Sequence, residues 1–179
     1  MADNSRRLTG EGTSRRAILE CGASGAGACL LALAGVRPAL AARGCDALLL
    51  NCMDYRLQDA TTAYMDRIGL RNDYDHVALA GASLGALTGR RPAWGKTFRE
   101  HLATALKLHE INRVVVLDHR DCAAYRLLLG EAAVRDLATE ARSHARVMRA
   151  LRARILRAHP RLKVDLGLMA LDGSVEPVS

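Results

Sequence analysis

Aromatic residues are scarce in this 179-residue sequence, which has one Phe, one Trp and four Tyr, or 3% of the chain. Proteins that bind single-stranded nucleic acid stack bases on aromatic side chains. The scarcity therefore argues against a nucleic-acid partner, although the net charge of +7 would suit an anionic one. Hydrophobic residues make up 50% and charged residues 25%, the balance of a globular domain that is long enough to bury a core.

A strongly hydrophobic membrane span is also missing from the first forty residues. Arg15 and Arg16 precede a weakly apolar, Gly- and Ala-rich run over 17–36, and Ala39-Leu40-Ala41 has the small-x-small form of a cleavage site. The pattern resembles a twin-arginine export signal. We therefore predict a cleavable signal over 1–41, and a periplasmic or secreted mature protein without a stable membrane anchor. An uncleaved anchor is the alternative, which the many glycines disfavour.

Cysteine is limited to five residues, of which two would leave with the signal. Cys45, Cys52 and Cys122 remain. An odd number of cysteines without a C-x-x-C pair makes a poor disulfide framework. Metal ligation is therefore the better expectation for two of them. Cys45 is left over, and we expect it to be buried near the new N-terminus or to pair between chains.

Four short apolar runs read as strands, and the central ones have the continuous Leu and Val character of strands buried on both faces of a parallel sheet. They span residues 47–51, 76–80, 113–118 and 163–171, the last nearer an edge. Helical spacing of apolar residues occurs over 59–68, 98–111 and 132–159. Strands that alternate with helices predict an α/β fold with a mainly parallel central sheet flanked by helices.

Two of the predicted strands run directly into chemically reactive residues. The first leads into Cys52, Asp54 and Arg56, which an extended chain would point the same way. The other leads into His119 and Cys122, and a turn that opens into a helix can bring these two residues together. Ligands gather at the carboxyl ends of such strands. The Cys, His and Cys side chains suit Zn²⁺, and three protein ligands leave an open position, as in catalytic zinc sites.

C-x-D-x-R at 52–56 followed by H-x-x-C at 119–122, each after an apolar strand, resembles the β-class carbonic anhydrases. The resemblance covers about residues 47–129 well. It makes 42–179 a β-carbonic-anhydrase-like zinc domain. Two departures concern the pocket wall: Ala123-Ala124 stands where members often have Gly, and Leu79-Ala80-Gly81 replaces the usual Asn-Ala-Gly.

The resemblance implies that Cys52, His119 and Cys122 bind Zn²⁺ and that Asp54 and Arg56 form the catalytic dyad. It implies a carbonate dehydratase that interconverts CO₂ and bicarbonate through a zinc-bound hydroxide. Asp54 would orient that hydroxide, and Arg56 would hold Asp54 ionised and away from the metal. The family builds its site at a dimer interface, so we expect a homodimer or a higher oligomer. The alternatives are a hydrolase of carbonyl sulfide or carbon disulfide and a zinc-binding domain without turnover.

Two further patterns have plainer interpretations. Residues 81–85, GASLG, match the G-x-S-x-G of α/β-hydrolases, but the following ALTGRRPAWG reads as a loop where that fold needs a helix. We expect a Gly-rich turn near the metal. The arginine-rich segment 132–159 could bind an anionic surface, but we favour a solvated or subunit-facing helix face with Leu151 and Ile155 opposite. No spacing partner assigns a role to the remaining histidines, His76 included.

Overall fold

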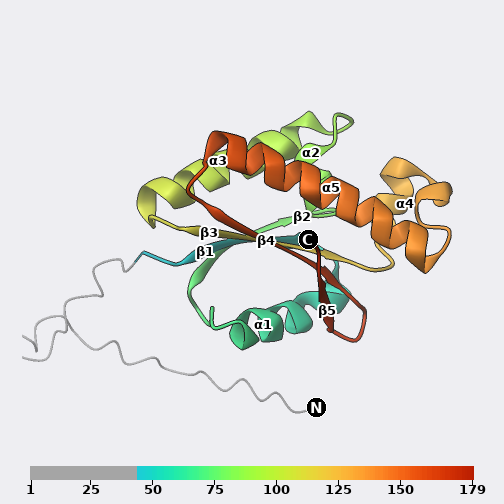
Figure 1. The fold of residues 1–179 in the computed structure, drawn as a ribbon, viewed down its shortest axis with the longest axis horizontal. Coiled ribbons are helices and arrows are strands. Elements are labelled where there is room, and N and C mark those ends of the chain that lie inside the picture. Colours follow the sequence, from blue (N-terminus) through green and yellow to red (C-terminus); the bar gives the residue numbers. More distant parts are fainter. Residues whose placement is uncertain (1–43) are drawn as a thin grey trace, which may run out of the picture. The chain divides into compact units, whose positions relative to one another are not determined.

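The computed structural model describes residues 44–179, and the predicted export signal lies outside them. Five strands form one sheet in the order β2-β1-β3-β4-β5 (Figure 1). The first four are parallel and β5 pairs antiparallel with β4. Their bounds are β1 Ala47–Cys52, β2 Tyr74–Leu79, β3 Arg113–His119, β4 Lys163–Met169 and β5 Val175–Pro177. The predicted α/β fold with a mainly parallel sheet is confirmed.

Helices cover both faces of the sheet (Figure 1). Helix α1 (Gln58–Arg67) lies on one face, and the other four helices lie on the opposite face. Those four are α2 Ser83–Leu87, α3 Pro92–Leu108, α4 Ala123–Leu129 and α5 Leu137–Ala158, and two short 3₁₀ helices are η1 Tyr55–Leu57 and η2 Glu131–Ala133. None of the helices within 44–179 combines the length and the apolar character needed to cross a membrane.

Strand β1 shows why its sequence is continuously apolar. All six of its residues are buried, because successive side chains enter opposite layers of the core. Leu48 and Leu50 pack with the four-helix layer, together with Cys52. Ala47 and Leu49 pack on the side of α1. The alternation thus places the Cys52 side chain in the layer between the sheet and the four helices.

Several predicted boundaries are wrong. The segment after GASLG is a loop only over 88–91, because α2 extends from Ser83 to Leu87 and α3 begins at Pro92. Proline suits that first turn, since its missing N–H would have no partner there. The helix predicted over 132–159 begins only at Leu137, where Asp136 caps it by accepting from Thr139 N. The C-terminal tail forms β5 at the sheet edge, so β4 is the strand next to that edge, in agreement with its predicted position.

The arginine-rich helix α5 has the predicted two-sided character. Leu151 and Ile155 are buried, together with Val147 and Met148. Its arginines lie on the outer side, where all but the half-buried Arg152 are exposed. An amphipathic helix with a charged outer face is therefore confirmed.

Candidate metal centre

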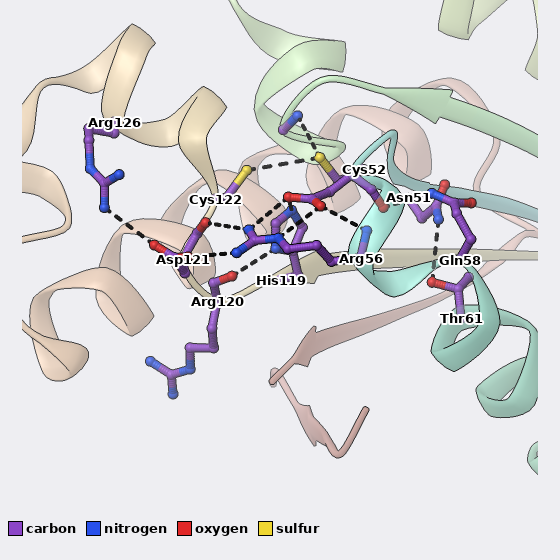
Figure 2. Close-up of polar contacts among 12 residues, drawn as sticks. Asn51, Cys52, Arg56, Gln58, Thr61, His119, Arg120, Asp121, Cys122 and Arg126 are labelled. Atoms are coloured by element: carbon purple, nitrogen blue, oxygen red, sulfur yellow. Dashed lines mark hydrogen bonds and ion pairs between the residues drawn. The ribbon is translucent and has the colours of Figure 1, made fainter. Parts of the chain in front are cut away.

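The carboxyl ends of β1 and β3 bring the predicted ligands together. The two strands are parallel neighbours, with Asn51 paired to Leu117, so both end at the same edge of the sheet. Cys52 ends β1, His119 ends β3, and Cys122 precedes the first residue of α4. Their ligand atoms lie within 4.8 Å of one another and all three residues are buried. The two sulfur atoms are 4.0 Å apart, and Figure 2 shows them facing each other.

The imidazole of His119 is held in the tautomer that a metal ligand needs. Its Nδ1 lies 2.7 Å from the carbonyl oxygen of Arg120. Because a carbonyl oxygen can only accept, Nδ1 carries the proton and Nε2 keeps its lone pair. Nε2 is buried and has no hydrogen-bond partner within the described part of the chain. A buried acceptor without a partner is costly, and a metal ion beside the two sulfurs would satisfy it.

The contact between the two sulfurs shifts the pKa values of the two thiols in opposite directions. The neighbouring Cys122 sulfur lowers the pKa of Cys52. The same contact raises the pKa of Cys122. Gly81 N–H also donates to Cys52 Sγ, at 3.3 Å, which confirms the predicted Gly-rich turn beside the metal ligands. A dication would stabilise both sulfurs as thiolates, so the Cys-His-Cys group fits the predicted cofactor, Zn²⁺.

Asp54 and Arg56 lie beyond the end of β1, so the alternation of side chains along a strand does not explain their contact. The strand ends at Cys52, and Asp54 caps the 3₁₀ helix η1 by accepting from Arg56 N. The Arg56 side chain then folds back onto the carboxylate, with Nε 3.0 Å from Oδ1 and Nη2 2.8 Å from Oδ2. These bonds lower the pKa of Asp54 to about 2. Asp54 Oδ2 lies 3.9 Å from His119 Nε2, so the pair borders the ligand group.

Arg56 has a second acidic partner that sequence reasoning missed. Its Nη1 lies 2.9 Å from Asp121 Oδ2, and its Nη2 donates to the Asp121 carbonyl oxygen at 3.1 Å (Figure 2). Asp121 has a left-handed φ of 55°, which directs its carbonyl and carboxylate to the same guanidinium. Buried Glu140 accepts from Asp121 N at 2.6 Å. Helix α5 thus supports the loop that connects His119, at the end of β3, to Cys122.

A buried carboxylate directly before His119 was also missed. Asp118 is 1% exposed, and its Oδ2 accepts from Tyr125 OH at 2.7 Å and from His144 Nδ1 at 2.9 Å. Ser83 donates both its N–H, at 3.0 Å, and its hydroxyl, at 2.7 Å. The network joins β3 to α2, α4 and α5. It also confirms that Ser83 is no exposed nucleophile, because its side chain is fully buried.

The chain matches known proteins at the level of sequence and of fold. The family described as putative carbonic anhydrase matches residues 42–164. An uncharacterized protein of Rickettsia conorii is 39% identical over 131 residues, which are 73% of this chain and 70% of that protein. One from Rickettsia bellii is 37% identical over 131 residues, which are 73% of this chain and 80% of that protein.

Solved carbonic anhydrases share the fold at low sequence identity. One from Glaciozyma antarctica is 19% identical with a TM-score of 0.50, over 83% of this chain and 90% of that one. A tetrameric β-carbonic anhydrase from Sordaria macrospora is 14% identical with a TM-score of 0.50, over 77% and 82%. The family match covers both motifs of the ligand group, from Cys52 to Cys122. The chain therefore belongs to the putative carbonic anhydrase family and has the β-carbonic-anhydrase fold.

Proposed function

We propose that this protein catalyses the reversible hydration of CO₂ to bicarbonate at a zinc site held by Cys52, His119 and Cys122. The observation that carries the proposal is the unpartnered, buried His119 Nε2, which lies beside two cysteine sulfurs and the Asp54 carboxylate. Zinc bound there would supply a Lewis acid that lowers the pKa of a water molecule towards neutrality.

Asp54 is placed to orient the attacking water. Its carboxylate borders the ligand group, and the low pKa keeps it ionised at neutral pH. An ionised carboxylate accepts a hydrogen bond from the water and so fixes the direction of the oxygen lone pair that attacks CO₂. Asp54 therefore acts on the reacting oxygen, whereas the three ligands act on the metal.

Arg56 is a positioning residue for Asp54. It binds both carboxylate oxygens and is itself fixed by Asp121, so Asp54 cannot turn towards the ligand group without breaking these bonds. A bidentate arginine–carboxylate pair restricts orientation more strongly than a single contact does. Arg56 would thereby keep the Asp54 carboxylate from turning onto a metal held by Cys52, His119 and Cys122.

A homodimer or a larger assembly of the same chain is part of the proposal. Met53 and Tyr55, on either side of Asp54, are 64% and 85% exposed. Leu127 on α4 is 74% exposed, and α4 begins directly after Cys122. Large apolar side chains this close to a candidate site are typical of surfaces that a partner covers. Gel filtration with light scattering tests this part of the proposal, and a monomer would contradict it.

Stopped-flow measurement of CO₂ hydration tests the proposed reaction. We expect the purified zinc-loaded protein to accelerate hydration and Asp54→Ala to lose about 100-fold or more in kcat/KM, with its zinc content retained. Zinc-loaded protein that is no faster than Asp54→Ala would contradict the carbonic anhydrase activity. Sulfide release from carbonyl sulfide or carbon disulfide would then favour a hydrolase, and no turnover would favour a zinc-binding domain.

Export by the twin-arginine route completes the proposal and rests on the sequence around Arg15 and Arg16. That route carries folded proteins, so zinc could be loaded before export, and the bound metal would protect Cys52 and Cys122 from oxidation outside. Fractionation of the native host with N-terminal sequencing tests it. We expect a periplasmic or secreted chain cleaved after about residue 41. A cytoplasmic protein with that segment intact would contradict the export.

A further inference from the structure

A second group of metal-binding side chains lies at the opposite ends of the strands. Cys45 precedes β1, Asp75 is the second residue of β2, and His109 follows the last residue of α3. The Cys52 group lies at the carboxyl end of β1, so the strand of six residues, about 20 Å long, separates the two groups. The second group is therefore independent of the site described above.

The three side chains point their ligand atoms at one another. Their donor atoms, one S, one N and one O, lie within 4.8 Å of one another. His109 Nδ1 is 2.7 Å from Asp75 Oδ2, and these two side chains are 35% and 31% exposed. Cys45 is half-buried and forms no disulfide with another cysteine of residues 44–179. The group is thus formed in the fold yet open enough for an ion to enter.

The backbone holds these residues in place without a metal. A Cβ at Gly44 would lie 2.2 Å from the His109 carbonyl oxygen, so only glycine lets the chain before β1 pass against the end of α3. Asp46 N then donates to the Asp73 carbonyl at 3.1 Å, and the Asp46 carbonyl accepts from Asn112 N at 3.1 Å. The segment that carries Cys45 is therefore tied both to the start of β2 and to the connection that follows His109.

We propose that Cys45, Asp75 and His109 bind a second divalent ion of the zinc class. Thiolate, imidazole and carboxylate are the side-chain ligands that proteins use for zinc, whereas Ca²⁺ and Mg²⁺ prefer oxygen ligands alone. The ion would replace the proton between His109 and Asp75 and the proton of the thiol. Such an ion clamps the chain that enters β1 onto β2 and α3.

A cysteine-nucleophile triad is the other chemistry that these residue types suggest, and the geometry disfavours it. A triad histidine meets the carboxylate through Nδ1 and the thiol through Nε2. His109 Nδ1 does lie 2.7 Å from Asp75 Oδ2, but the Cys45 thiol donates to the Ala47 carbonyl oxygen, at 3.5 Å, instead of to His109. Burial and the Asp75 carboxylate also raise the pKa of Cys45, the reverse of what an activated thiol needs.

Zinc counting tests the second site on the full-length protein. After loading with ZnCl₂ and removal of excess, we expect two zinc ions per chain by elemental analysis in the wild type. Cys45→Ser and Asp75→Asn should each bind one, as should Cys52→Ser, and the double variant Cys45→Ser/Cys52→Ser should bind none. His101→Gln, at an exposed histidine on α3, is the matched control and should retain two.

Cobalt provides a second measurement that does not depend on activity. Co²⁺-loaded wild type should show thiolate-to-cobalt absorption that falls by about one third in Cys45→Ser, because one of three thiolate ligands is lost. Circular dichroism confirms that each variant is folded. One zinc ion in the wild type that Cys45→Ser still binds, or two that persist in both Cys45→Ser and Asp75→Asn, would overturn the second site. If the wild type binds one ion and Cys45→Ser binds none, the second site is supported and the Cys52 site is contradicted instead.

Discussion

Arg56 donates to both carboxylate oxygens of Asp54, through Nε at 3.0 Å and Nη2 at 2.8 Å. Only one residue separates them in the sequence, and η1 gives the turn that lets the side chain fold back. The other side of the same guanidinium is bound by Asp121, from the loop that connects two of the proposed metal ligands, His119 and Cys122. Arg56 therefore connects the ends of β1 and β3 across the candidate site.

Replacing Arg56 with Lys should reduce activity while zinc stays bound. An ammonium cannot bind both oxygens of Asp54 in a fork and reach Asp121 as well. We expect kcat/KM for CO₂ hydration to fall about 10- to 100-fold. Arg71→Lys is the matched control, because Arg71 pairs with Asp66 far from the ligand group. Equal kinetics for the two variants would argue against the positioning role of Arg56.

Asp118→Asn should destabilise the fold. The buried carboxylate accepts from Ser83, Tyr125 and His144, and an amide would turn one acceptor oxygen into a donor among these groups. We expect the free energy of unfolding to fall by about 2–4 kcal/mol. Urea denaturation measures this, and Asp59→Asn at an exposed position should change it by less than about 0.5 kcal/mol. Similar midpoints for both variants would contradict the role of the network.

His76 should make stability depend on pH. Burial lowers its pKa below the ordinary 6.5, and its Nε2 is 2.7 Å from Asn51 Oδ1. Below pH 6.5 the unfolded chain therefore binds a proton that the folded chain resists, so the free energy of unfolding falls as the pH falls from about 7 to 5. In His76→Gln this part of the fall should be absent. Parallel urea-stability curves for wild type and variant would contradict this assignment.

The strands and the ligand group could be predicted because each depends on local pattern. Two continuous apolar runs, Leu48 to Leu50 and Val114 to Val116, are fully buried. Only a strand that is covered on both faces of the sheet would bury every residue of such a run. Cys52 and His119 then follow from the rule that parallel strands present their carboxyl ends at one edge. The turn at η1 was missed, because it depends on the Asp54 side chain capping its own backbone.

The supporting residues could not be predicted, because they meet only through tertiary packing. Glu140 comes from the first turn of the arginine-rich helix α5, yet its carboxylate is buried and accepts from Asp121 N. Cys45 and His109 are 64 positions apart and carry no spacing signal. The clue present in the sequence was Asp118, a charged residue at the end of an apolar run.

Exchange of ¹⁸O between labelled CO₂ and water, followed by mass spectrometry, tests the central claim most directly, because it reports reversible hydration without an indicator. We expect the zinc-loaded protein to accelerate loss of the label, a chelator to abolish the effect, and added Zn²⁺ to restore it. Cys52→Ser should be inactive even with excess zinc, whereas Cys45→Ser should exchange like the wild type. Loss of label at the uncatalysed rate, with zinc bound to Cys52, His119 and Cys122, would contradict the proposed function.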